Sequence, residues 1–192
     1  EWGQGRSIFG GLTAALVLVH IESNHDLTGR DLRTVNIHFC GAVIAEVPCE
    51  FRHRVLSQGR SVTQIEGQLL QAGEVKTEIV ACFTSDRVSA IGIDFPAKQF
   101  PVAVQDTSEM AFTFKQGSAP HFVGYFDLRQ TNDNLPFTGS DHSLITGWMG
   151  FSKPSETLND ASILALIDAW PPAIPDSYTH LRAHETRHDR VC

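Results

Sequence analysis

Residues 6–22, RSIFGGLTAALVLVHIE, decide how the rest of this sequence is interpreted. Gly10 and Gly11 open a nearly uninterrupted apolar run that ends at His20. A membrane-spanning helix needs about 20 apolar residues, whereas a run of about 10–14 is typical of a buried helix or a signal sequence. No small-x-small cleavage motif follows Val19, which disfavours the signal sequence. The run therefore predicts no membrane span but a helix that starts near Gly10 and is enclosed on every side by other structure.

The overall composition is that of a folded globular protein, and 192 residues suit one or two domains. The net charge of −7 argues against nucleic acid or an anionic membrane as the main partner, because neither offers counter-charge to an acidic surface. Cys40, Cys49, Cys82 and Cys192 show no C-x-x-C spacing. The first three lie in apolar or alternating contexts, which predicts reduced core thiols and a reducing, cytoplasmic compartment.

From Asp31 onward the periodicity changes from helical to alternating. Residues 33–39, RTVNIHF, place apolar side chains at every second position, as a half-buried strand does. Strand-like runs follow at 47–55, 61–71 and 75–83, with turn signals between them, and predict an antiparallel meander. An antiparallel sheet usually buries one face, and the apolar helix needs a cover. A sheet wrapped around a central helix meets both needs, which predicts an α+β hotdog fold.

The middle of the chain breaks this rhythm. Residues 85–121 contain three prolines and no sustained period, which predicts a linker with room for one short edge strand at 110–114. The pattern then restarts with strands at 123–128 and 145–151 and a helix at 161–170, capped by Asn159 or Asp160. This order repeats that of the first half, and a weak internal duplication is the simplest account.

Four stretches stand out by their order and spacing: GRSIFGG at 5–11, RTVNIHF at 33–39, VLSQGRSVTQIEGQLLQAGEV at 55–75 and ALIDAWPPAI at 165–174. Together they resemble the acyl-CoA thioesterase II family, the double-hotdog thioesterases. The resemblance implies a nearly complete first hotdog unit at 1–84, a linker at 85–121 and a partial second unit at 122–175. Residues 176–192 do not continue the β-pattern, so we expect a disordered or foreign tail and a C-terminal truncation.

The resemblance also implies an activity. Such enzymes are hydrolases of lipid metabolism that convert a fatty acyl-CoA and water to a free fatty acid and CoA, without a metal or a redox cofactor. Asp168, in ALIDAWPP, matches the family's catalytic carboxylate on the second helix. The family pairs this carboxylate with a hydroxyl and an amide residue on later strands of the second unit. Because those strands are absent from this sequence, the partners of Asp168 and the activity of this chain alone stay open.

Elementary chemistry leaves two explanations for each candidate residue. Gly10 and Gly11 would let a substrate carbonyl oxygen reach the N–H groups of a helix N-terminus, which makes them substrate-binding candidates. Equally, two glycines let a helix start tightly against a sheet. Asp168 lies among apolar neighbours that should raise its pKa, which suits a general base or a nucleophile. The alternative is an exposed aspartate without a role.

Three rival functions remain. The first is a hotdog protein that binds acyl-CoA without hydrolysing it, and the second is a hotdog hydratase or dehydratase, although neither helix start carries the histidine typical of that chemistry. The third is a fragment that assembles with another chain, because exposed sheet edges favour association, including homo-oligomers. The spacing of His180, His184, His188 and Cys192 would place four metal-binding side chains on one helix face, but an uncapped polar tail predicts no metal site.

Overall fold

A computed structural model describes residues 2–92, 108–109, 120–131, 145–153 and 157–170. The chain divides into two compact units that do not follow its order. The first comprises residues 1–98, 114–126 and 151–169, and the second comprises residues 99–113, 127–150 and 170–192. The predicted edge strand at 110–114 and the tail at 176–192 lie outside the described residues.

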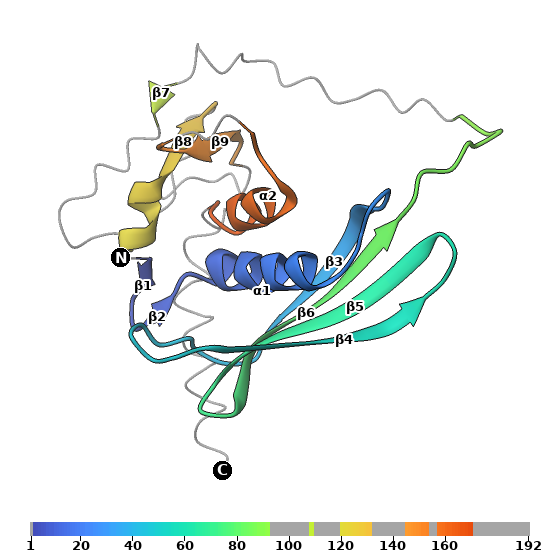
Figure 1. Ribbon diagram of the computed structural model, residues 1–192. Coiled ribbons are helices and arrows are strands. Elements are labelled where there is room, and N and C mark those ends of the chain that lie inside the picture. Colours follow the sequence, from blue (N-terminus) through green and yellow to red (C-terminus); the bar gives the residue numbers. More distant parts are fainter. Residues whose placement is uncertain (1, 93–107, 110–119, 132–144, 154–156, 171–192) are drawn as a thin grey trace, which may run out of the picture. The chain divides into compact units, whose positions relative to one another are not determined.

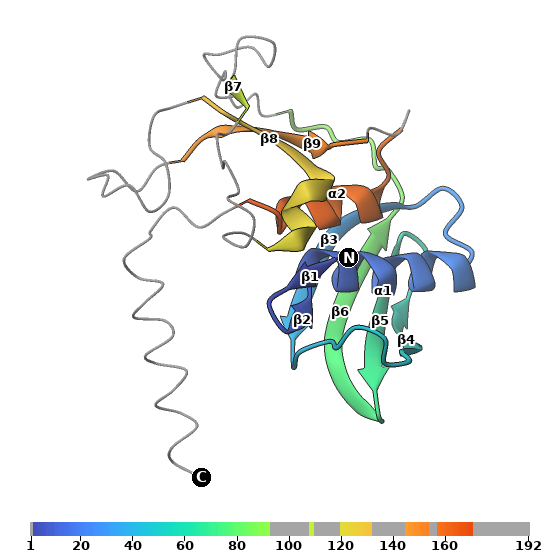
Figure 2. The same cartoon turned by 90° about the vertical axis from the view of Figure 1, so that its left-hand side faces the viewer.

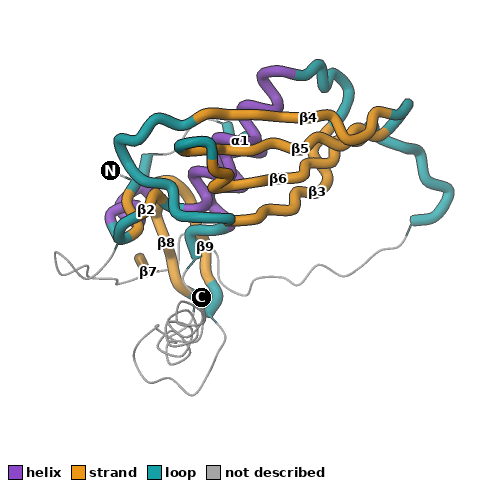
Figure 3. Tube along the Cα trace, turned by 90° about the horizontal axis from the view of Figure 1, so that it is seen from below, coloured by secondary structure: helices purple, strands orange, loops and turns teal. Residues whose placement is uncertain are grey.

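In the first unit, one helix lies on a four-stranded antiparallel sheet (Figure 1 and Figure 3). The helix α1 spans Gly10–Asn24, and the strands are β3 (Asp31–Phe39), β4 (Glu50–Gln58), β5 (Val62–Gln71) and β6 (Glu74–Thr84). Their order in the sheet is β3-β6-β5-β4, so β3 and β4 form its edges. The predicted α+β hotdog arrangement is confirmed, and the four predicted strands are found within about three residues of their expected bounds.

The turn between β5 and β6 sets the register of the two central strands. Ala72 and Gly73 both have positive φ angles, of 52° and 80°, and they join a pairing of Gln71 with Glu74. A residue without Cβ takes this left-handed conformation at little cost, which explains Gly73. The resulting register pairs Ile65 with Ala81, and both side chains are fully buried beneath α1.

The core forms where α1 meets this sheet. Val17, Leu18 and Ile21 are fully buried on the helix. Gly67 on β5 makes room for them, because a Cβ atom at this position would lie 2.7 Å from Val17 Cγ1. Such close packing is typical of a protein interior, and it aligns the helix with the central strands.

The prediction that this helix is enclosed on every side is wrong at two positions. Leu16 and Val19 are each 42% exposed, whereas Leu18 is fully buried. The sheet covers one face of α1, and α2 (Asp160–Ile167) packs on the side away from the sheet (Figure 1 and Figure 2). Two layers cannot cover the whole circumference of a helix, so an apolar stripe remains in contact with solvent. Neither described helix is long and apolar enough to cross a membrane.

The second predicted helix is present but short. The side chain of Asn159 caps it by accepting a hydrogen bond from Ser162 N at 2.8 Å. The helix ends at Ile167 rather than at Trp170, and Asp168 is its C-cap residue. The two helices run antiparallel, because the C-terminal end of α2 contacts the start of α1 and Asp160, at the start of α2, lies near Glu22 at the end of α1. Burial and, to a smaller extent, the charge of Asp160 raise the pKa of the Glu22 carboxyl.

Two features before α1 and after the linker were not predicted. A short hairpin of β1 (Gly3–Gln4) and β2 (Ser7–Ile8) precedes α1. The 3-10 helix η2 (His121–Tyr125) replaces the first part of the strand expected at 123–128, and Phe122 stacks on Phe9 with a ring separation of 4.2 Å. These aromatic contacts fix the path of the backbone into α1, because Phe9 is the N-cap residue of this helix.

The second unit contains a three-stranded sheet with the order β7-β8-β9. Its strands are β7 (Ser108–Glu109), β8 (Phe126–Gln130) and β9 (Gly147–Phe151), and Ser108 pairs with Gln130 in antiparallel register. Beyond β8, the Thr131 N–H donates to the Thr146 carbonyl at 2.9 Å. The strand expected at 145–151 is thus found within two residues of its predicted start.

The described cysteines differ from the prediction in their location. Cys40, Cys49 and Cys82 are all free thiols. However, Cys40 and Cys49 are exposed in the connection between β3 and β4, and Cys82 is only half-buried. The prediction of core thiols is therefore wrong for the first two, because they lie beyond the strand ends where the alternating pattern no longer decides burial.

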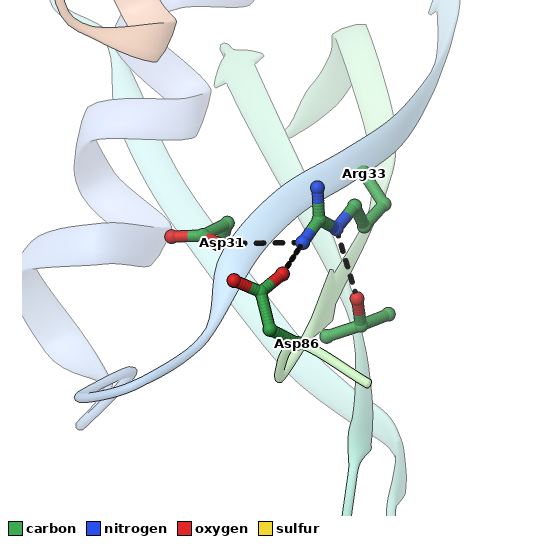
Figure 4. A network of polar contacts seen from close by, with 4 residues as sticks. Asp31, Arg33 and Asp86 are labelled. Atoms are coloured by element: carbon green, nitrogen blue, oxygen red, sulfur yellow. Dashed lines mark hydrogen bonds and ion pairs between the residues drawn. The ribbon is translucent and has the colours of Figure 1, made fainter. Parts of the chain in front are cut away.

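Arg33 on β3 holds the start of the segment after β6 (Figure 4). Its guanidinium donates to Thr84 Oγ1 at 3.1 Å and forms ion pairs with Asp31 and Asp86. All three charged side chains are exposed, so water competes with these pairs and their contribution to stability is small.

Candidate functional site

The three site residues predicted from the sequence lie together at the start of α1. No side chain caps α1 from its N-cap residue, Phe9. Instead, the Asp168 carboxylate, from the end of α2, accepts a hydrogen bond from the backbone N–H of Gly11. Asp168 Oδ2 also lies 3.0 Å from the position that a Cβ atom on Gly10 would occupy. A carboxylate placed at this end of a helix is stabilised by unpaired N–H groups and by partial positive charge.

Gly10 and Gly11 lack a side chain for different structural reasons. A Cβ atom on Gly11 would lie 2.6 Å from the Phe9 ring and 2.8 Å from the backbone oxygen of Ala165, so Gly11 is required for packing against α2. The nearest neighbours of a Cβ atom on Gly10 would be the ends of two side chains, Asp168 Oδ2 and Phe39 Cζ, both at 3.0 Å. Gly10 is therefore the position at which a carboxylate and an aromatic ring approach the helix backbone.

Local burial raises the pKa of the Asp168 carboxyl, and the hydrogen bond from Gly11 partly opposes this rise. The residue as a whole keeps an exposed surface, but its carboxylate end lies against the first turn of α1. Asp168 thus differs from an aspartate that only faces solvent. A more basic carboxylate is a better proton acceptor, which is the property that a general base needs.

A cavity of about 290 Å³ opens beside Asp168. Its polar lining comes from one amide and three hydroxyl side chains, those of Gln4, Ser7, Thr13 and Thr77. Its apolar lining includes Ile8, Phe39 and Val43. Cavities that combine apolar walls with convergent polar groups are where proteins bind small molecules.

Two hydroxyl groups in this cavity form a chain that ends at Gly10. Thr13 Oγ1 donates to the Gly10 carbonyl at 2.8 Å, and it lies 3.0 Å from Thr77 Oγ1. Because the Thr13 proton is engaged by Gly10, Thr77 is the donor to Thr13. The Thr77 oxygen then keeps its lone pairs, so it can accept a hydrogen bond from water or ligand in the cavity.

The loop that forms one wall of the cavity is held by a buried amide. Gly41, Ala42 and Val43 line the cavity from the β3–β4 connection. Gln71, only 3% exposed, accepts from Ile44 N at 2.9 Å and donates to the carbonyls of Ile44 and Val47 at 2.9 and 3.1 Å. A buried amide that uses both its ends in this way fixes the backbone it contacts.

Several of these residues were missed from the sequence. Thr13 interrupts the apolar run at 6–22, and this polar position was the one local signal available. Gln71, Thr77 and Phe39 looked like ordinary strand residues. Their role at the cavity depends on contacts between distant segments. In the part of the chain that the structure describes, no three histidine, cysteine or acidic side chains are grouped to hold a metal ion.

Two family models match almost the whole chain. The model of the acyl-CoA thioesterase N-terminal domain matches residues 1–84, and that of the acyl-CoA thioesterase C-terminal domain matches residues 99–187. The chain belongs to the acyl-CoA thioesterase family. No curated protein sequence matches this thioesterase-family chain.

Solved structures share the fold. A hotdog-fold protein of unknown function from Alicyclobacillus acidocaldarius is 21% identical, with a TM-score of 0.75, and the match covers 90% of this chain and 62% of that one. A protein assigned as a thioesterase II from Thermobifida fusca is 17% identical, with a TM-score of 0.67, and the match covers 90% of this chain and 64% of that one. An acyl-CoA thioesterase II from Mycobacterium marinum is 20% identical, with a TM-score of 0.60, and the match covers 83% of this chain and 59% of that one.

These matches mean that the thioesterase-family chain spans about three fifths of the length of these solved relatives. At such low identity the likeness establishes the hotdog fold, while residue roles have to be argued from the site itself.

Proposed function

We propose that this chain hydrolyses a fatty acyl-CoA thioester to a fatty acid and CoA. The observation that carries the proposal is the Asp168 carboxylate, held against the first turn of α1 at the edge of a cavity with hydroxyl and apolar walls. Family membership supports the reaction class. The geometry supports the roles, because a basic carboxylate and a helix N-terminus meet at one point.

In the proposed reaction Asp168 removes a proton from water, and the water oxygen attacks the thioester carbonyl carbon. The Gly11 N–H donates to Asp168, so the partial positive charge and the other N–H groups of the first turn of α1, which begins at Gly10, stabilise the developing oxyanion. When the tetrahedral intermediate collapses, the carbon–sulfur bond breaks and the proton passes from Asp168 to the CoA sulfur. Thr77 would position the water by accepting its second proton in a hydrogen bond.

The test is release of free thiol from a panel of acyl-CoA thioesters. Asp168→Asn should lower kcat at least a hundredfold, because it removes the general base. Asp160→Asn is the matched control, since it changes an exposed aspartate at the opposite end of the same helix, and it should leave kcat unchanged. Full activity of Asp168→Asn would remove this residue from the mechanism.

Two further measurements, binding of acyl-CoA and conversion of an enoyl-CoA, separate the rival functions. Binding of acyl-CoA in calorimetry without thiol release would favour a protein that binds without hydrolysis. Conversion of an enoyl-CoA with the thioester intact would favour a hydratase.

We also propose a cytoplasmic location, which the three free cysteines in the described part of the chain support. We further propose self-association through the edge strands β3 and β4. Fractionation of cells and sedimentation of the purified chain test these two points. A monomer at micromolar concentration would contradict the second.

A further inference from the structure

Phe39 is an exposed aromatic residue at the rim of the cavity. It is the last residue of β3, and 53% of its surface is exposed. Its ring tip lies 3.0 Å from the position of a Cβ atom on Gly10, the same distance as Asp168 Oδ2. The ring and the carboxylate therefore flank the same glycine, one apolar and one charged.

Within the described residues, no side chain covers the exposed part of the Phe39 ring. No other described aromatic side chain stacks on Phe39, in contrast to Phe9, which packs on Phe122. Because Phe39 lines the cavity, its half-exposed ring offers apolar surface to a molecule bound there.

The size of the cavity limits what it can enclose. At about 290 Å³ it lies at the lower end of the range for small-molecule sites, which is about 300–1,000 Å³. A thioester group and a few carbons fill this space, so the remainder of a long acyl chain has to leave past the rim. At the rim Phe39 supplies apolar surface, which suits a hydrocarbon chain and offers nothing to the charged phosphates of CoA.

We propose that Phe39 is a specificity-determining residue, whose exposed ring binds the part of a long acyl chain that extends beyond the cavity. The proposal rests on the proposed function, because it takes an acyl-CoA as the ligand of this site. It predicts a preference for long acyl chains that depends on one side chain. Truncating this ring should raise KM for a long-chain substrate about tenfold to fiftyfold, from the apolar area that the ring and the chain would bury together.

The experiment compares Phe39→Ala, Phe39→Leu and the unchanged chain on acetyl-, butyryl-, octanoyl- and palmitoyl-CoA. We expect Phe39→Ala to raise KM for palmitoyl-CoA at least tenfold more than it raises KM for acetyl-CoA. Phe39→Leu should restore most of the preference, because leucine keeps apolar surface at the rim. Ile44→Ala is the matched control, since Ile44 is 43% exposed in the neighbouring loop but does not line the cavity, and it should change neither parameter.

Two results would overturn the proposal. The first is a KM that changes equally for all chain lengths in Phe39→Ala, and the second is a KM that does not change at all. If the alanine variant fails to fold, Phe39→Gln answers the question, because it keeps a long side chain but replaces the apolar surface by an amide. It should raise KM for palmitoyl-CoA more than KM for acetyl-CoA, and an equal or absent change would overturn the proposal.

Calorimetry of the same series separates this proposal from the proposed function. If the unchanged chain releases no thiol but binds acyl-CoA more tightly as the chain lengthens, the hydrolysis proposal fails. The Phe39 proposal then stands only if Phe39→Ala abolishes that dependence. Absence of any binding would overturn both.

Discussion

Replacing Gly10 and Gly11 by alanine, one at a time, distinguishes an effect on packing from an effect on catalysis at the start of α1. In Gly11→Ala the new Cβ atom would lie 2.6 Å from the Phe9 ring and 2.8 Å from the backbone oxygen of Ala165. Neither neighbour can move freely, because Phe9 is almost fully buried and stacks on Phe122, and Ala165 O belongs to the α2 backbone. In Gly10→Ala the new atom would meet only side-chain ends, which can rotate away.

The magnitude follows from these contacts. Overpacking against fixed neighbours costs about 1–3 kcal/mol, whereas alanine gains at most about 1 kcal/mol over glycine in a helix. We therefore expect Gly11→Ala to lower the free energy of unfolding by about 1–2 kcal/mol, which corresponds to a decrease in Tm of about 2–8 °C for a chain of this size. Gly10→Ala should stay within about 0.5 kcal/mol of the unchanged chain, but it should displace Asp168 and lower thiol release.

Thermal unfolding followed by circular dichroism, together with urea titration, measures the first effect, and the thiol assay measures the second. An unchanged or raised Tm of Gly11→Ala would refute the argument, because α2 could not then lie against this residue. Equal destabilisation by both substitutions would refute the distinction between them. Loss of thiol release in Gly10→Ala at unchanged Tm is the result expected if the approach of Asp168 to this backbone matters for catalysis.

Four further predictions concern other parts of the structure. Gln71→Leu should lower the free energy of unfolding, measured in urea, by about 2–3 kcal/mol, because the buried backbone groups of the 41–49 loop lose their hydrogen-bond partner. Gln64→Leu, an exposed position on the same strand, is the control, and an equal or smaller cost for Gln71→Leu would contradict this role of Gln71. Burial raises the pKa of Asp168 on folding, so its ionisation costs stability as pH rises above the ordinary aspartate value of about 4, and the stability gained by Asp168→Asn should appear above this pH and be absent below it. A gain independent of pH would contradict this. Burial and the neighbouring His53, whose Nδ1 lies 2.9 Å from His20 Nε2, lower the pKa of His20, so the free energy of unfolding should fall as pH drops below about 6.5. If His53→Gln does not reduce this decline, the interaction between the two histidines is not its cause. Arg33→Ala should cost less than about 1 kcal/mol in the same urea assay, because its ion pairs are exposed (Figure 4), and a larger loss would mean that the network is shielded from water.

The positions of the main elements could be predicted from local patterns. Alternation in residues 33–39 and in the runs after it is a property of single strands, and it places β3 to β6 without knowledge of their neighbours. Asn159 caps α2 because its side chain contacts a backbone group three residues away. Such contacts are short in sequence, so the sequence contains all the information they need.

The site could be predicted only in part. Asp168 was predicted from the resemblance of its motif to a family, and Gly10 and Gly11 were predicted from the chemistry of a helix N-terminus. Their proximity depends on the antiparallel packing of α2 against α1. The contact of Thr13 with Thr77 depends on the register of β6 beneath α1, which no local pattern encodes.

Sequence periodicity alone thus determined that an apolar helix and an antiparallel sheet form and which faces of the strands are apolar. Tertiary structure decided how much of the helix is covered, which leaves Leu16 and Val19 in water, and which distant side chains share the cavity beside Asp168. The physical reason is that periodicity reports the preference of one segment for burial. Coverage and contact depend instead on how many layers pack together and on the register in which they meet.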